Sequence, residues 1–418
     1  MYSSVLTSAQ ATGVDMADDH DVMMSRWAHL QSCLFPWMRE EIEPLTSSLE
    51  RLIIVLDTIG LEAYVPGPPC FGRGRKPDDR RALARTFVAK ALLGLPTTSA
   101  LVERLKLDKS LRRICGWETK RQVPSESTFS RAFAEFAETK LPAQLHEAQV
   151  KRSLGQRVVG CIARDATEIE AREKPAQKGA ETPPLSPSAG TPAPQQEAST
   201  PAPRKRGRPK KGEERPKEPT RLEQQPTQNL DEMLADIPTA CDVGTKKNSK
   251  GYKETWVGYK LHIDVANGQI PISCVLTSAS VHDSQVAIPL MTITGRRVTY
   301  LYDIMDSAYD AAAIISYSTS LGHMPVVDHN FRSATDLKEE AIAETKRREF
   351  IHMPDPDVLI YNFRTMVERV NGRLKDEFGG RTVRVRGAAK VYCHLMFGML
   401  VLTVDQILRA FRPSAMLG

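Results

Sequence analysis

The sequence predicts an α/β protein, with a mixed-sheet domain preceded by an all-α domain and interrupted by a disordered insertion. Three observations lead to this prediction. Apolar residues recur at helical spacing between residues 77 and 137, and later segments are rich in the β-branched and aromatic residues typical of strands. Between residues 175 and 238, in contrast, Pro, Ala, Gln, Glu, Lys and Ser replace almost all the large apolar residues.

Four helices are predicted in the N-terminal part of the chain, at residues 78–93, 99–107, 110–117 and 125–136. A Pro96-Thr97-Thr98 break separates the first two, and Ser125 after Pro124 is a suitable N-cap for the fourth. Short helices that carry arginines could form a helix-turn-helix-like DNA-binding region, although a plain helical bundle has the same pattern. We assign a helical DNA-binding domain to residues 46–150 and regard residues 1–45 as a weakly ordered lead-in.

Five strand-type segments predict the sheet, at residues 158–163, 256–264, 270–277, 297–303 and 324–328. Asn267-Gly268 predicts a two-residue hairpin turn between the second and third of them. Helices are predicted at residues 308–321 and 361–378. This order of elements gives one mixed sheet with helices layered on it, assigned to residues 151–174 and 241–418.

The segment from residue 175 to 240 interrupts that domain. It cannot bury enough apolar surface to offset the entropy cost of ordering, so we expect no stable structure. Inside it, Lys205-Arg-Gly-Arg-Pro-Lys-Lys-Gly212 resembles an AT-hook, in which Arg206 and Arg208 would enter the narrow minor groove of A·T-rich DNA. A basic, proline-rich solubilising linker is the alternative interpretation.

Charge and cysteine usage restrict the class of protein further. The net charge is +6, but basic residues cluster at 73–85, 204–217 and 364–390, which favours a nucleic-acid partner. Seven cysteines without a C-x2-C pair argue against a disulfide framework and a zinc site, and a reducing cytoplasm fits. No signal peptide is visible, and the longest apolar run, 391–404, is too short to span a bilayer and predicts a buried core helix.

The most informative segment spans residues 361–375 and reads Y-x2-R-x3-E-x6-K. On a helix, its four polar residues fall within a stripe about 60° wide: Tyr361, Arg364, Glu368 and Lys375. The apolar residues fall on a separate stripe: Val367, Val370, Leu374 and Phe378. This arrangement suits a carboxylate that holds a metal beside cations that hold a phosphate backbone. A surface helix with an Arg-to-Glu pair is the alternative interpretation.

Two further carboxylates stand at strand ends, where Asp165 closes the first strand and Asp306 follows the fourth. With Glu368 they could hold two divalent cations, which prefer oxygen ligands. Asp303 competes with Asp306, because the same strand could deliver either residue. The glutamates that follow Asp165 are expected to solvate the exit of the strand: Glu168, Glu170 and Glu173.

Together these motifs resemble DDE-type bacterial insertion-sequence transposases with a Tyr-Arg-Glu-Lys signature. The resemblance covers residues 70–174 and 241–410. Asp165 in Arg-Asp-Ala-Thr resembles the first aspartate of the family, Asp306 in Asp-x-x-Tyr-Asp the second, and Glu368 the glutamate. The segment 278–283 is also similar, but no role is assigned to its His282 or Asp283.

The resemblance implies a ribonuclease H-like catalytic domain that cleaves and transfers DNA strands. It implies Asp165, Asp306 and Glu368 as catalytic ligands of two Mg²⁺ or Mn²⁺ ions. Arg364 and Lys375 would contact DNA phosphates, and Tyr361 would hydrogen-bond to a phosphate or stack on a displaced base.

The implied partners are double-stranded transposon ends and target DNA, bound by a homodimer in the bacterial cytoplasm at the nucleoid. No membrane partner and no small-molecule substrate are expected. Two alternatives remain: a catalytically inactive DNA-binding protein derived from a transposase, and a metal-dependent DNA nuclease without strand transfer.

Overall fold

The computed structural model of the protein describes residues 45–66, 78–176, 219–247, 251–328 and 360–411, with parts of 339–347. The expected lead-in, except residue 45, and the AT-hook-like segment lie outside the described residues.

The N-terminal part is helical, as predicted, and begins one helix earlier than expected. Its helices are α3 (Ser47–Ile59), α4 (Arg80–Leu92), α5 (Thr98–Leu107), α6 (Lys109–Cys115) and α7 (Glu126–Glu138), with short 3-10 turns at Leu61–Ala63 and Lys120–Gln122. Side chains of Asp79, Thr97 and Asp108 accept hydrogen bonds from backbone N–H groups in the first turns of α4, α5 and α6. These caps explain why three helices follow one another with such short connections.

Phenylalanine rings connect the N-terminal helices to the C-terminal helix α16 (Ala388–Phe411). The ring of Phe87 on α4 lies 5.0 Å from that of Phe133 on α7 and 5.6 Å from that of Phe397 on α16. Phe129 and Phe136 of α7 complete the cluster, each with its ring centroid 6.1 Å from that of Phe87. The helical part and the sheet part therefore share one apolar core.

The sheet has six strands: β1 (Val158–Glu170), β2 (Asp242–Lys247), β3 (Lys253–Ala266), β4 (Ile270–Ser278), β5 (Thr299–Met305) and β6 (Met324–Val327). Their order is β2-β3-β1-β5-β6, and β4 also pairs with β3. β3 runs antiparallel to β1, β2 and β4, whereas β1, β5 and β6 are parallel. This mixed sheet agrees with the predicted ribonuclease H-like domain.

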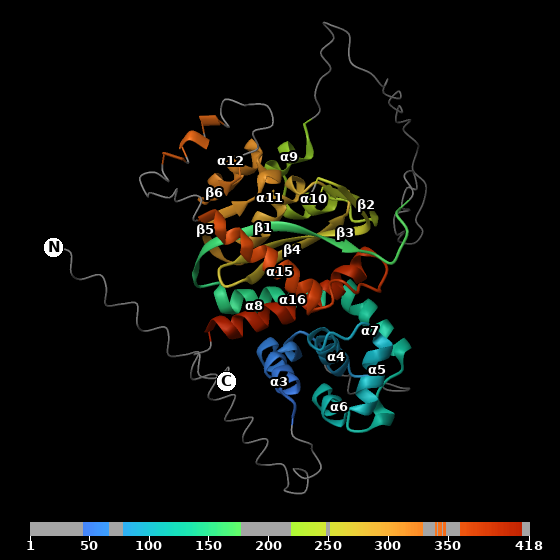
Figure 1. Ribbon diagram of the computed structural model, residues 1–418. Coiled ribbons are helices and arrows are strands. Elements are labelled where there is room, and N and C mark those ends of the chain that lie inside the picture. Colours follow the sequence, from blue (N-terminus) through green and yellow to red (C-terminus); the bar gives the residue numbers. More distant parts are fainter. Residues whose placement is uncertain are drawn as a thin grey trace, which may run out of the picture.

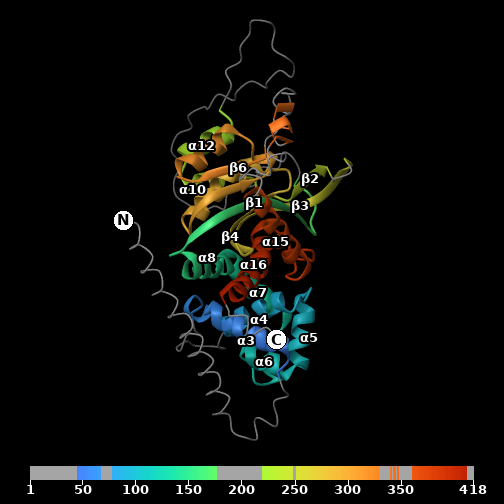
Figure 2. The same cartoon turned by 60° about the vertical axis from the view of Figure 1, so that its left-hand side comes forward.

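Helices cover both faces of the sheet (Figure 1). On one face lie α8 (Leu141–Leu154), α15 (Thr365–Asp376) and α16; on the other lie α10 (Leu230–Asp236), α11 (Ser284–Gly295) and α12 (Ala312–Ser320). The turned view in Figure 2 places the N-terminal helices beyond α16, away from the sheet. Helix α16 is therefore sandwiched between the sheet and the helical part.

The predicted disordered insertion, residues 175–240, extends too far toward the C-terminus. Residues 219–240 are ordered. They form α9 (Arg221–Gln224), a 3-10 turn (Gln225–Thr227) and α10. Capping boxes begin both helices, at Thr220 and Asn229, and the side chains of Met233 and Ile237 are buried. Two apolar anchors and good caps are enough to order a segment whose average composition resembles that of disordered chains.

Further elements escaped prediction, namely α3, α8, α11 and β2. The hairpin between β3 and β4 also differs, since its loop has three residues, 267–269, with positive φ at Gly268 and Gln269. The side chain of Asn267 is turned inward, where its Oδ1 accepts a hydrogen bond from the Cys161 N–H at 2.7 Å. This contact attaches the loop to β1.

Helix α16 is longer than the predicted apolar run, at 24 residues. By length and composition it is the one described helix that could cross a membrane, but 83% of its most apolar window is buried inside the protein. The expectation that the segment is too short to span is therefore wrong, whereas the predicted burial is confirmed. Asp405 lies in the part of the helix beyond the apolar run, where it is paired with Arg51 and Arg373.

We expect Phe87→Ala to destabilise the protein by about 3–5 kcal/mol, since it removes a ring that contacts three phenylalanines of α7 and one of α16. Urea unfolding measures this loss. Phe363→Ala is the control, because the Phe363 side chain is 48% exposed and its removal should change the free energy of unfolding little. Equal effects of the two substitutions would contradict a shared core centred on Phe87.

Candidate active site

Asp165 lies on β1, and Asp306 directly follows β5, the neighbouring parallel strand. Ala163 of β1 pairs with Ile304 of β5, so Asp165 and Asp306 each follow a paired residue by two positions. Side chains two residues apart point to the same face of a sheet, and Ala163 and Ile304 both belong to the core shared with α15. Asp165 and Asp306 therefore emerge on the α15 face.

Asp165 is largely enclosed beneath α15. Its Oδ2 accepts a hydrogen bond from Nδ2 of Asn371 on α15 at 3.2 Å. Burial raises the pKa of Asp165 to about 7; the negative charge of Asp306 adds to this, and a backbone hydrogen bond and Arg364 oppose it. The positive charge of Arg364 therefore does not offset the effect of burial on this carboxyl group.

Asp306 begins a 3-10 turn, Ser307–Tyr309, and its Oδ1 accepts a hydrogen bond from the Ala308 N–H at 3.0 Å. Burial raises the pKa of this carboxyl, although that N–H and the charge of Arg364 lower it. Both aspartates are thus carboxylates for which a nearby cation would remove an electrostatic cost.

Glu368 lies on α15, and its Oε1 accepts a hydrogen bond from Nη2 of Arg364 at 2.5 Å. Its side chain is 50% exposed. Burial alone would lower the pKa of Arg364, but Tyr361 and the carboxylates of Glu368, Asp165 and Asp306 raise it. One guanidinium therefore lies within electrostatic reach of all three predicted carboxylates.

The fit of these residues to divalent metal is partial. Asp165 and Asp306 supply the carboxylate oxygens that Mg²⁺ prefers, with pKa values raised by the burial that a cation would offset. Glu368 instead faces Arg364, and no group of three or more His, Cys, Asp or Glu side chains within the described ranges is gathered closely enough to hold a metal. The assignment of all three as ligands stays a prediction, and it requires Glu368 to leave Arg364.

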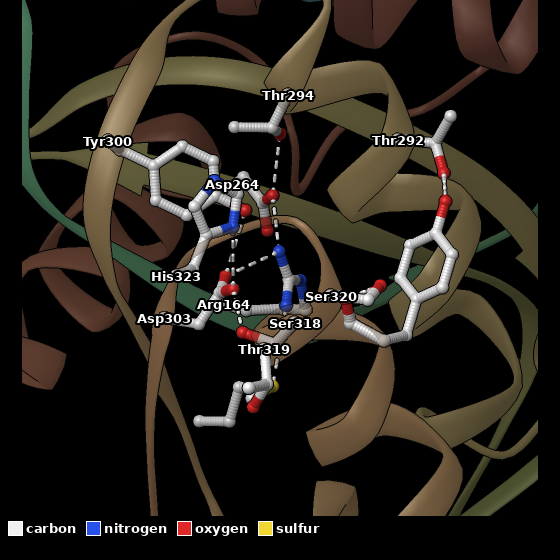
Figure 3. Close-up of polar contacts among 12 residues, drawn as sticks. Arg164, Asp264, Thr292, Thr294, Tyr300, Asp303, Ser318, Thr319, Ser320 and His323 are labelled. Carbon is white, nitrogen blue, oxygen red and sulfur yellow. Dashed lines mark hydrogen bonds and ion pairs between the residues drawn. The ribbon is translucent and has the colours of Figure 1, made fainter.

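Asp303, the alternative to Asp306, points to the opposite face of the sheet. It is fully buried and pairs with Arg164, which also forms an ion pair with Asp264 at 2.7 Å. Ser318 and Tyr300 donate further hydrogen bonds to Asp303 (Figure 3). Although burial raises the pKa of Asp303, Arg164, His323 and Ser318 lower it overall. All its oxygens are engaged, which favours Asp306 as the residue available for chemistry.

Lys375 is already paired with an acidic residue. Its Nζ lies 2.6 Å from Oε1 of Glu168 on β1, and its side chain is 14% exposed. This contact attaches the end of α15 to β1 and weighs against the predicted phosphate contact. Glu168, expected to solvate the strand exit, is instead bound by Lys375 and Lys246, and Glu173 accepts hydrogen bonds from Tyr259 and Gly387.

The start of the signature segment is not regular α-helix. Residues Asn362–Arg364 form a 3-10 turn, and α15 begins at Thr365. Tyr361 therefore does not follow the 100° spacing used to place it on the polar stripe. Its ring is nevertheless beside the guanidinium of Arg364, whose central carbon is 5.9 Å from the ring centroid.

Three residues near the site received no role in the sequence analysis. Asn371 is three positions after Glu368, a spacing that could have placed it on the same side of α15. Asp283 lies at the start of α11, where its Oδ1 is 3.0 Å from Nζ of Lys260, and its charge contributes to the raised pKa of Asp165. Tyr309 is buried, and its hydroxyl has no hydrogen-bond partner among the described residues. No sequence pattern indicates that environment.

Comparison with protein families matches residues 219–404 to the Transposase DDE domain and residues 38–135 to the Transposase domain (DUF772). Both are transposase domains. Together the matches support a DDE-type insertion-sequence transposase, with DNA as the implied partner and divalent metal as the general cofactor of the family. Asp306 and Glu368 fall inside the first match, and Asp165 falls between the two. Searches among curated proteins and among solved structures gave no match.

The ion pairs of Glu168 predict a pH-dependent contribution to stability. Burial would raise the pKa of Glu168, but the hydrogen bonds from Lys375 and Lys246 lower it from 4.5 to about 2. Because the pKa is lower in the folded state, the stabilisation is present above pH 4.5 and is lost as the pH falls toward 2. Glu168→Gln should therefore cost about 1–2 kcal/mol at pH 7 and less at pH 3.5, measured by urea unfolding.

Glu170→Gln is the matched control, since Glu170 is an exposed glutamate on the same strand. Its removal should change stability little at either pH. A Glu168→Gln effect that stayed constant between pH 7 and 3.5 would mean that the ion pairs are not its source.

Proposed function

We propose that the protein is a transposase that cuts the ends of an insertion sequence and joins them to target DNA. Asp165, Asp306 and Glu368 are the catalytic carboxylates in this proposal. The observation that carries it is that all three carboxylates act electrostatically on one side chain, that of Arg364. This arrangement lies on the face of the sheet where β1, β5 and α15 meet. The two transposase-domain matches supply independent support.

The chemistry needs no covalent enzyme intermediate. Water attacks phosphorus at the transposon end and releases a 3′-hydroxyl, which then attacks a target phosphodiester and displaces its 3′ oxygen. Divalent cations, when bound to the carboxylates, activate the attacking oxygen and stabilise the leaving one. Asn371 holds the carboxylate of Asp165 in place by its hydrogen bond. Because burial raises the pKa of Asp165 to about 7, a cation held by this carboxylate would replace the proton that it carries in part at neutral pH.

Arg364 has two roles in the proposal. Without DNA it neutralises Glu368 and moderates the charge on Asp165 and Asp306. With DNA, a phosphate competes for its guanidinium, which frees Glu368 for metal. Tyr361, beside Arg364, contacts the same phosphate or an adjacent base. Lys375 is left out of this contact, because Glu168 already binds it. We further propose that the protein acts as a homodimer that holds two transposon ends together.

The carboxylates are tested by Asp165→Asn, Asp306→Asn and Glu368→Gln. Each should reduce Mg²⁺-dependent cleavage of transposon-end DNA by at least about a thousandfold, while end binding changes little. Gel assays of cleaved and strand-transfer products, together with binding by fluorescence anisotropy, measure both quantities. Asp231→Asn, an exposed aspartate on α10, is the control and should retain activity.

The wild-type reaction separates the alternatives. Cleavage without joined products would indicate a nuclease, and end binding without cleavage would indicate an inactive DNA-binding protein. Full activity of Glu368→Gln would remove the third carboxylate from the proposal.

The AT-hook-like motif remains a prediction, because it lies outside the described residues. Replacing Arg206 and Arg208 together with Ala should lower affinity for A·T-rich duplexes more than for G·C-rich ones, as measured by fluorescence anisotropy. Strand joining on pre-bound ends should not change. Equal losses on the two duplexes would instead indicate a general electrostatic contact.

A further inference from the structure

A cavity of about 300 Å³ lies between the N-terminal helices and the loop that connects α15 to α16. Aromatic side chains form much of its wall: Phe87, Phe133, Phe378 and Phe397. Thr98 and Ser130 add hydroxyl groups. The cavity is on the C-terminal side of α15, whereas Glu368 is in the first turn of that helix. It is therefore separate from the predicted carboxylate site by about 12 Å of helix.

The same cavity is lined by three cationic residues, Lys90, Arg386 and Lys390, and by no carboxylate. Within the described part of the chain, neither Lys90 nor Lys390 forms an ion pair, and Nε of Arg386 donates only to the backbone oxygen of Arg172. Burial lowers the pKa of Lys90 to about 8. An ammonium group that is mostly covered and has no acidic neighbour carries an electrostatic cost that a bound anion would remove.

His394 does not supply a compensating charge. Its Nε2 is 3.0 Å from the backbone oxygen of Gly379, and burial, with a contribution from Lys90, lowers the pKa of the ring to about 4. The imidazole is therefore neutral at pH 7 and acts as part of the wall. The cavity thus combines an aromatic surface with positive charge that no carboxylate in its wall compensates.

We propose that this cavity binds one unpaired nucleotide, with its base against the phenylalanine rings and its phosphate at Lys90, Arg386 and Lys390. Flat aromatic bases stack on aromatic side chains, and phosphate is the anion for lysine and arginine clusters. The volume is at the lower end of the range for small-ligand sites, which suits a single nucleotide.

The side chains of the cavity alone indicate a nucleotide as the ligand. That this nucleotide belongs to a DNA strand rests on the proposed function. A free nucleoside monophosphate presents the same groups. Isothermal titration calorimetry of the full-length protein with deoxythymidine monophosphate tests the free form. Fluorescence anisotropy with a labelled ten-nucleotide single strand tests the DNA form, with the monophosphate as competitor.

Lys390→Glu should weaken binding of the single strand by about tenfold or more, since it removes a phosphate contact and adds repulsion. Lys390 is exposed, so this variant should fold. Lys90→Met removes the covered ammonium with similar side-chain volume and should have a comparable effect. Lys120→Glu is the control, because it makes the same charge change at an exposed position that does not line the cavity.

Asp165→Asn should bind the single strand like the wild type, which separates this inference from the proposed catalysis. Competition by the monophosphate supports a nucleotide site; displacement only by the strand assigns the site to DNA. Equal affinities for wild type, Lys390→Glu and Lys90→Met would overturn the inference. It would also fail if the wild type cleaved transposon ends but bound neither probe, and the proposed function would then stand without it.

Discussion

The arrangement of the sheet depends on one buried guanidinium. Arg164 on β1 pairs with Asp264 on β3 and Asp303 on β5, and all three side chains are fully buried. Leaving a buried charge without its partner costs about 3–5 kcal/mol, so the three strands are held in one register. The next residue on β1 is Asp165, and Asp306 follows Asp303 by three positions. The electrostatic contacts on one face thus set the spacing of the carboxylates on the other.

Negative charge is compensated to different degrees on the two faces of β1. Around Arg164, the two aspartates pair with its guanidinium inside the protein, and Thr294 and Ser318 donate further hydrogen bonds to Asp264 and Asp303. Around Asp165, compensation is incomplete, and Arg364 is the nearby cation that acts on both aspartates. A stable fold and a reactive site are therefore built from neighbouring residues of one strand, because successive side chains point to opposite faces.

Local patterns in the sequence predicted the mixed sheet, five of its six strands and helices α4 to α7, since each has a strong periodic signal or a cap. They missed α11, whose Pro289 lies inside the helix, and α10, which has a polar composition. For the site, strand ends and helix spacing selected Asp165, Asp306 and Glu368, but the expectation that Asp165 ends its strand is wrong, because β1 continues to Glu170. The pairing of Lys375 with Glu168 could not be predicted, because it joins residues 207 positions apart and depends on how α15 lies on β1.

The position of α16 between the two parts of the molecule has a consequence for biosynthesis. The ribosome produces the N-terminal helices and all six strands before it produces residues 388–411. Until then, the apolar surfaces that meet this helix, including the part of the Phe87 ring that faces Phe397, lack this one partner. Early intermediates should therefore depend on chaperones, and the nascent chain should gain its compact form late, in a single step.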